Sequence, residues 1–253
     1  MKIYRPLLFL TIFIFIFAPA FTVFARSKSS FINSVHTSKK VVALTFDADM
    51  TPKMLNQLKK NKVSSWYNKD VIDVLEKANV PATLFLTGMW VQAYPEITTQ
   101  LSSNTLFEIA NHSYSHPAFS SPCYGLSKLT EPNDLSEITK TEELLSKQTA
   151  HHSNFFRFPG LCYDDNDLEL ATSHGYIVIG GDVHGNDGFE KNTSKIVSQV
   201  VSHVKPGSIV VMHMMGGPNA PHTGDALPAI IEKLKKEGYE FVTVSQLLKL
   251  SDK

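Results

Sequence analysis

Two histidines stand four positions apart in the segment His112-Ser-Tyr-Ser-His116. A turn or a short helical segment at this spacing would bring both imidazole rings to one side of the chain. Two neutral imidazoles with one carboxylate form a common catalytic site for zinc or a similar divalent ion, with positions left for water and substrate. Paired histidines in a polar loop can also be accidental, so the motif alone leaves metal binding open.

Two aspartates strengthen the prediction of a metal site. Asp47 and Asp49 lie at the end of a predicted strand, residues 41–46. Residues i and i+2 of an extended chain point to the same side, so both carboxylates can enter one pocket. One could bind the metal while the other accepts a proton from the attacking water. For Asp49 a turn before Thr51-Pro52 is the competing interpretation.

Other residues with catalytic chemistry follow later predicted strands. His213 ends an apolar run, where it suits a general acid that protonates a leaving amine, although a lone histidine there is more often a core residue. Asp182 or Asp187 could hold its ring, and Asp182 is the first choice. Arg157 could pair with a pocket carboxylate and keep it ionised, or it could belong to a surface turn before Pro159-Gly160.

The elements that must position these residues alternate between strands and helices. Several apolar runs are nearly continuous in Val, Ile, Leu and Phe, which is typical of parallel strands covered on both faces. Helical spacing places Val71 with Leu75, and Ile230 with Leu234, on single apolar faces. This order predicts an α/β fold with about seven parallel strands, a barrel rather than an open sheet, and a site at the carboxyl ends of the strands. The expected strands are residues 41–46, 82–87, 106–110, 154–158, 176–179, 208–212 and 241–244.

Four of these segments, in this order, resemble the motifs of the polysaccharide deacetylase family (carbohydrate esterase family four, the NodB homology domain). Thr45-Phe-Asp-Ala-Asp49 is similar to the first motif, and His112-Ser-Tyr-Ser-His116 matches the second. Arg157-Phe-Pro-Gly160 matches the third, and Val211-Met-His213 matches the last. The resemblance spans residues 41–248 and implies a distorted (β/α) barrel of fewer than eight strands that deacetylates N-acetylated sugar polymers with a divalent metal.

The resemblance also implies a role for each residue. His112 and His116 would bind the metal, which we expect to be zinc, with cobalt or nickel as alternatives. Asp47 would be the catalytic base, Arg157 would orient it, and His213 would be the acid.

Two departures from the family pattern bear on these roles. The family's metal-binding aspartate directly follows the base, but Ala48 occupies that position, so Asp49 is expected to replace it. The fourth motif normally contains Asp-x-x-Asp-Trp, and its tryptophan is absent here. The partner of His213 therefore stays open, with Asp182 preferred. The segment from Met214 to Pro221 is similar to that of a subgroup with Asp-Ala-Asp motifs, which favours a working variant.

The amino terminus predicts export. Lys2 and Arg5 precede an apolar run, and Val23-Phe-Ala25 offers small residues at signal-peptidase spacing. We therefore expect a signal peptide at 1–25, a polar linker at 26–40 and one catalytic domain at 41–253. The protein would be periplasmic or secreted, with no stable membrane partner after cleavage; an uncleaved anchor is the alternative.

Composition and the resemblance bear on different partners. With 24 basic and 24 acidic residues the chain has no basic surplus for phosphates, so we exclude a nucleic-acid partner. The family resemblance, together with the predicted export, implies an N-acetylated glycan, peptidoglycan first and a chitin-like glycan second. The aromatic residues Trp66, Tyr67, Trp90 and Tyr163 could stack on sugars or pack in the core. The two cysteines, Cys123 and Cys162, could pair in an oxidising compartment or remain free. Alternative functions are an amidohydrolase for a small non-sugar C–N bond and a glycan-binding pseudoenzyme.

Overall fold

The computed structural model describes Met1, residues 31–129 and residues 134–252. Apart from Met1, the expected signal peptide lies outside these described residues. In the described part of the chain, no helix combines the length and apolar character needed to cross a membrane.

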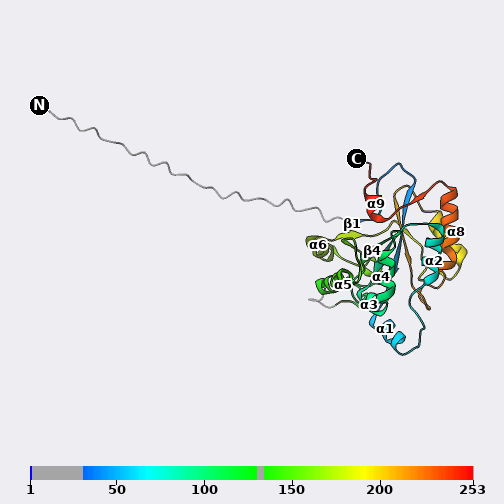
Figure 1. Cartoon of the computed structure of the whole chain (residues 1–253), viewed down its shortest axis with the longest axis horizontal. Helices are drawn as coiled ribbons and strands as arrows, with labels where there is room; N and C mark the ends of the chain where they lie inside the picture. The colour runs from blue at the N-terminus through cyan, green and yellow to red at the C-terminus, as the bar shows by residue number, and fades with distance from the viewer. Residues whose placement is uncertain (2–30, 130–133, 253) are drawn as a thin grey trace.

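A single sheet of parallel strands forms the centre of the fold (Figure 1). Its order is β1-β6-β5-β4-β3-β2-β8-β7, with β9 paired to β2, and the path is that of an incomplete barrel. The expected α/β class and distorted parallel barrel are confirmed. The two-residue strands β1 and β7 were not expected. The strands are β1 (Phe31–Ile32), β2 (Val41–Ala48), β3 (Ala82–Leu86), β4 (Phe107–Asn111), β5 (Phe155–Phe156), β6 (Ile177–Ile179), β7 (Val183–His184), β8 (Ser208–His213) and β9 (Glu240–Phe241).

Helices cover the outer face of the sheet. Figure 1 shows α2 and α8 side by side on one flank and α5 and α6 on the opposite flank. The predicted apolar faces are buried, with Val71 and Leu75 in α2 and Ile230 and Leu234 in α8. The helices are α1 (Pro52–Lys59), α2 (Lys69–Ala78), α3 (Gly88–Ala93), α4 (Pro95–Ser103), α5 (Asp134–Gln148), α6 (Asp165–Ser173), α7 (Thr193–Val201), α8 (Thr223–Lys236) and α9 (Val244–Leu248), with a 3₁₀ turn at Pro159–Leu161.

Strand β2 divides the core into an outer and an inner part. Val42, Leu44, Phe46 and Ala48 belong to the large cluster that also contains the apolar faces of α2 and α8. Val41 and Ala43 belong to a second cluster with Phe85, Ala110, Ile209 and the apolar side of α9. Because side chains alternate along a strand, Thr45 and Asp47 continue the inner row. The interior of the barrel is therefore apolar at the amino end of β2 and polar at its carboxyl end.

The expectation of a linker over residues 26–40 is corrected from Phe31 onward. Strand β1 pairs with β6, and the Val35 amide donates to the Gly207 carbonyl at 2.9 Å. The side chains of Val35 and Thr37 are buried. A two-residue strand is too short to give a periodic apolar pattern, which is why the sequence did not reveal this attachment.

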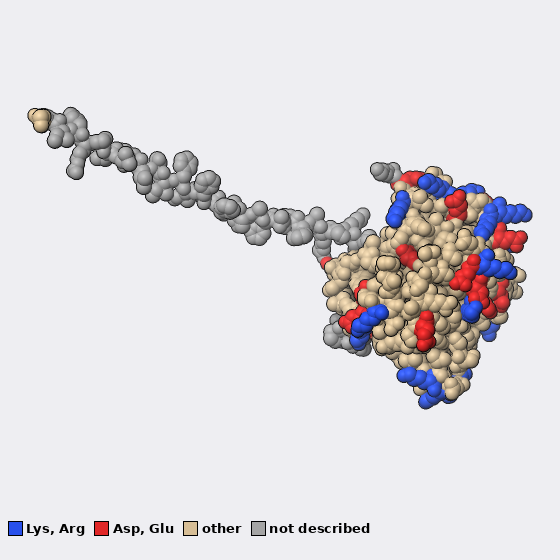
Figure 2. All heavy atoms as spheres, viewed as in Figure 1, with Lys and Arg blue, Asp and Glu red and all other residues tan. Residues whose placement is uncertain are grey.

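Charges of both signs are mixed on the surface. On the face drawn in Figure 2, Lys and Arg side chains alternate with Asp and Glu, and no extended basic region is present there. This distribution agrees with the zero net charge of the chain.

Candidate metal and catalytic site

Three residues from two strand ends form a buried cluster with the composition of a metal site. The Oδ1 atom of Asp49 lies 3.4 Å from Nε2 of His112 and 3.3 Å from Nε2 of His116. In the described residues, Asp49 Oδ1 is buried and accepts no hydrogen bond. A buried carboxylate oxygen without a donor, facing two imidazole nitrogens, is the arrangement that a divalent cation would satisfy. The donor set therefore fits the metal that the sequence implied.

Local hydrogen bonds leave the cluster free to face the cavity. Nδ1 of His112 lies 2.9 Å from the Arg157 carbonyl oxygen, which fixes the ring with Nε2 toward Asp49. The turn after β2 is capped by Thr51, whose hydroxyl accepts from the Met54 amide, so Asp49 is not consumed by the turn that was its alternative role. Burial raises the pKa of Asp49, but His116, His112 and His213 together hold that pKa well below its usual value.

A glutamate that sequence reasoning missed shapes the histidine loop. Ser113 and His116 both have positive φ, 67° and 57°, which is uncommon for side chains of this kind. Glu137 of α5 holds this loop, because its carboxylate accepts from the amides of Tyr114 and Ser115 at 3.0 and 2.7 Å and from the Ser115 hydroxyl at 2.9 Å. Glu137 is buried and lies on a weakly amphipathic helix, so no motif or spacing indicated it.

Arg157 crosses the barrel interior to reach Asp47. Its Nη1 donates to Asp47 Oδ1 at 2.6 Å, while Nε and Nη2 donate to the carbonyls of Ile179 and Gly180 at 3.2 and 2.9 Å. The guanidinium lies 3.9 Å from the centre of the Phe85 ring. A fully buried arginine with this many partners is rigid, and it holds the side chain of Asp47 in place. The second carboxylate oxygen of Asp47 lies 3.7 Å from His112 Nε2.

His213 at the end of β8 is paired with Asp187. Its Nδ1 lies 2.9 Å from Asp187 Oδ1, its amide donates to Oδ2 at 2.8 Å, and the Thr223 hydroxyl also donates to Oδ2. Burial lowers the pKa of His213, but Asp187 above all, with Asp49 and Asp47, outweighs burial and raises that pKa to about 10. Nε2 of His213 lies 4.0 Å from Asp49 Oδ2 and so faces the metal cluster.

The first choice of Asp182 as the partner of His213 is wrong in this structure. Its carboxylate accepts from the Ser208 hydroxyl and the Ile209 amide, both at 2.9 Å, at the opposite end of β8. At about 3.3 Å per residue, the five positions from Ser208 to His213 correspond to roughly 16 Å. In the parallel register, Val183 lies beside Val210, so only a residue beyond β7 can reach the end of β8.

A cavity of about 770 Å³ is lined by Asp47, Asp49, His112, His116, Asp187 and His213, among other residues. Its rim includes Cys162, which forms a disulfide with Cys123 across a Cα–Cα distance of 5.9 Å, so the open question of free or paired cysteines is answered for pairing. Trp66 and Trp90 are buried in the core and are not available to stack on sugars. Tyr67 and Tyr163 are partly buried and do not line this cavity.

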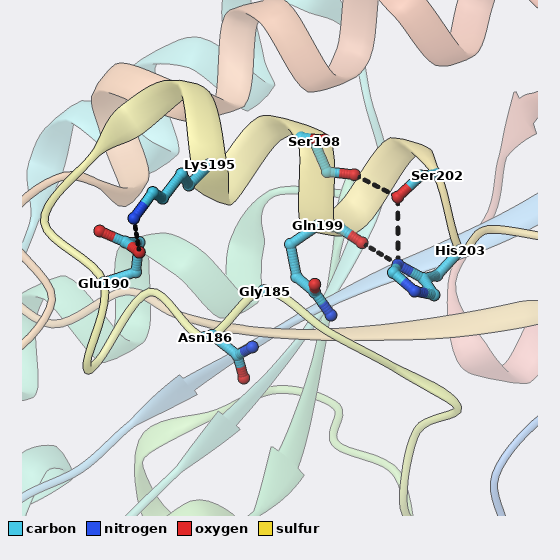
Figure 3. Close-up of a pocket in the computed structure, with 8 residues that line it drawn as sticks. All are labelled: Gly185, Asn186, Glu190, Lys195, Ser198, Gln199, Ser202 and His203. Carbon is cyan, nitrogen blue, oxygen red and sulfur yellow. Dashed lines mark hydrogen bonds and ion pairs between the residues drawn. The ribbon is translucent and has the colours of Figure 1, made fainter.

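A second, polar depression adjoins the first. It has a volume of about 380 Å³, lies between α7 and the loop after β7, and shares Asn186 and Gln199 with the catalytic cavity (Figure 3). Its charged members, Glu190 and Lys195, form an ion pair at 3.5 Å. Its other polar groups bond mainly within α7 and its carboxyl end, so it offers no arrangement resembling the metal cluster.

Comparisons with known proteins agree with this geometry. The sequence profile of the polysaccharide deacetylase family matches residues 34–179. The chain is 31% identical over 218 residues to a peptidoglycan-N-acetylglucosamine deacetylase of Bacillus cereus, covering 85% of this chain and 70% of that protein. It is also 31% identical over 214 residues to the peptidoglycan-N-acetylmuramic acid deacetylase PdaC of Bacillus subtilis, covering 85% of this chain but only 40% of that longer protein.

A solved structure of a peptidoglycan N-acetylglucosamine deacetylase superposes with a TM-score of 0.73 at 28% identity, covering 88% of this chain and 94% of the other. The profile match covers more than half of the chain. The chain therefore belongs to the polysaccharide deacetylase family.

Proposed function

We propose that this protein is a metal-dependent hydrolase that removes N-acetyl groups from an N-acetylated polysaccharide, with peptidoglycan as the first candidate and a chitin-like glycan as the second. The observation that carries the proposal is the Asp49–His112–His116 cluster beside two prepared proton-transfer groups, Asp47 and His213. The names of the relatives support the substrate class. They also support action at the cell wall, and hence a periplasmic or secreted protein.

A divalent cation, zinc first and cobalt or nickel as alternatives, would be held by Asp49, His112 and His116. When bound, it supplies Lewis-acid activation of the attacking water and of the acetyl carbonyl, and it stabilises the developing negative charge. The buried, undonated oxygen of Asp49 and the fixed ring of His112 are the features of this chain that support such a site.

The chain's own residues perform the proton transfers. Asp47, held in place by the buried guanidinium of Arg157, accepts a proton from water as the water oxygen forms a bond to the acetyl carbon. His213 then donates a proton to the sugar nitrogen as the C–N bond breaks, which yields acetic acid and a free amine; the acid then gives its proton to the amine, which leaves acetate and an ammonium group. The overall reaction consumes one water, and the proton gained by Asp47 balances the proton lost by His213.

Asp187 prepares His213 for its donor role. A histidine whose pKa is raised to about 10 is protonated at neutral pH, as a general acid must be before the C–N bond breaks. A cation bound at Asp49 would lower this pKa, because like charges repel, and so would make His213 a stronger acid. Asp187 therefore acts as a positioning residue that fixes both the orientation and the charge of the ring.

The deciding experiment compares Asp49→Ala with Asp225→Ala. Asp225 is a matched control because it also lies beside a histidine, His222 at 3.1 Å, but on the exposed first turn of α8 outside the cavity. Elemental analysis of the purified proteins should find one divalent metal per chain in the wild type and in Asp225→Ala, and none in Asp49→Ala. Acetate release from N-acetylated oligosaccharides should follow the same pattern.

Each failure has a distinct meaning. Full metal content and activity in Asp49→Ala would show that the ligand assignment is wrong. A wild-type protein that binds glycan but contains no metal and releases no acetate would be a pseudoenzyme. A metal-loaded wild type that is inactive on every oligosaccharide and active on small amides would be an amidohydrolase of another specificity.

A further inference from the structure

Two exposed aromatic side chains meet at the mouth of the catalytic cavity. In the described part of the chain, the exposed large apolar side chains are Met1, Tyr124 and Phe189, and the last two are 74% and 72% exposed. The centres of their rings lie 5.6 Å apart, and both residues line the cavity. Exposed apolar groups that gather at one place beside a ligand cavity mark a binding surface more often than a chance arrangement.

The two rings come from separate loops. One loop is held by the Cys123–Cys162 disulfide, and the other contains Asp187, which contacts His213. Tyr124 follows Cys123, whose disulfide to Cys162 ties the loop after β4 to the loop that carries Gly160. A Cβ atom at Gly160 would lie 3.3 Å from the Tyr124 ring, so this ring packs closely on the loop. Phe189 stands two positions after Asp187, the partner of His213, and its amide donates to the Asn186 carbonyl at 2.9 Å.

We propose that Tyr124 and Phe189, here called the aromatic rim, stack against the sugar unit next to the one that is deacetylated. This proposal rests on the proposed function, because it assigns a second part of the same glycan to this cavity. A pyranose ring presents a face of C–H groups, and covering two exposed aromatic rings with that face removes apolar surface from water on both partners.

The ring spacing decides how the sugar is held. Carbon atoms in contact are about 3.5–4.0 Å apart, so a sugar sandwiched between two rings needs their centres at least about 7 Å apart. The ring centres are 5.6 Å apart and the ring planes are tilted by 42°, so the rings leave no space for a sugar between them and offer their outer surfaces instead. A sugar unit would lie against these outer surfaces while its neighbour reaches the metal cluster. The aromatic rim therefore favours a polymer over a single sugar.

The test compares kcat/KM of the full exported chain on a tetrasaccharide and on the single sugar N-acetylglucosamine. In Tyr124→Ala and Phe189→Ala, kcat/KM on the tetrasaccharide should fall about tenfold for each ring, which corresponds to about 1.4 kcal/mol. Activity on the single sugar should be maintained. Tyr124→Phe and Phe189→Tyr keep the rings and serve as matched controls that should retain tetrasaccharide activity.

Equilibrium binding separates this proposal from the proposed function. In an Asp47→Asn background, which removes the base, titration with the tetrasaccharide should show the same tenfold loss of affinity for each alanine variant. If the wild type deacetylates no glycan but this binding loss is found, the proposed function fails and the aromatic rim stands. An equal loss on the single sugar and the tetrasaccharide, or no loss of tetrasaccharide affinity, would overturn the aromatic rim. Thermal unfolding of each variant checks that folding is unchanged.

Discussion

Moving the third ligand to the position usual in the family should fail in this chain, and the double variant Ala48→Asp/Asp49→Ala tests this. Ala48 belongs to the outer row of β2 and is fully buried in the apolar cluster shared with α2 and α8. Its side chain therefore points away from His112 and His116. An aspartate at position 48 would place its carboxylate in the apolar core. At the same time, the cluster of Asp49, His112 and His116 found in the described residues would lose its carboxylate.

The size of the effect follows from this burial. A buried charge without a partner costs about 3–5 kcal/mol. Typical domains unfold with about 5–15 kcal/mol, so the loss is a large share of the total. At about 2–4 °C per kcal/mol for a domain of this size, the melting temperature should fall by about 6–20 °C relative to Asp49→Ala. Because burial favours the neutral carboxyl, the loss should be smaller at pH 5 than at pH 8.

Denaturant unfolding and elemental analysis are the assays. The single variant Asp49→Ala should lose the metal without a comparable loss of stability, whereas Ala48→Asp should keep the metal and lose stability. The double variant should lose both. A double variant that binds one metal per chain and unfolds at the same denaturant concentration as Asp49→Ala would refute the assignment of Ala48 to the outer face.

Three further predictions concern groups that support the site. In metal-free protein, Asp187→Asn should lower the pKa of His213 from about 10 toward 6.5. A raised histidine pKa stabilises the fold fully below pH 6.5, and this stabilisation is lost as pH rises through 10, so urea unfolding should show a gap between wild type and variant that closes over this range. Glu137→Gln should weaken metal binding about 10–100-fold by loosening the histidine loop, measured by competition with a chelator; unchanged affinity would contradict this role. Arg157→Lys should retain the metal but reduce kcat, because one ammonium group cannot reproduce three directed contacts, and a wild-type kcat would argue against a role in holding Asp47.

Much of the fold could be predicted because its central strands carry strong signals. The apolar runs that became β2, β3 and β8 are long and buried on both faces, so their residue types alone indicated parallel strands. The strands β1 and β7 have two residues each, and their formation depends on neighbours already in place. Pattern reasoning has no access to such tertiary pairing.

Some residues of the candidate site could also be predicted from the sequence, whereas others depend on tertiary contacts. Residues at the ends of strong strands, such as Asp47, Asp49 and His112, could be placed from alternation and strand order. The choice between Asp182 and Asp187 depended on the register of β7 against β8, which spacing did not contain. Tyr124 and Phe189 lie in loops whose paths are set by a disulfide and by a tertiary carboxylate contact, so their meeting could be seen only in three dimensions.

The Cys123–Cys162 disulfide makes the structure of the cavity mouth depend on the redox state of the compartment that holds the protein. The bond joins the loop of Tyr124 to the loop that follows Arg157, so it connects the proposed glycan-binding edge to the segment that holds Asp47. Disulfides persist in oxidising compartments and are reduced in the cytosol. If the chain is exported as proposed, its two loops stay unlinked until it leaves the cytosol. The proposed binding surface would then be completed only in the compartment that holds the polymer.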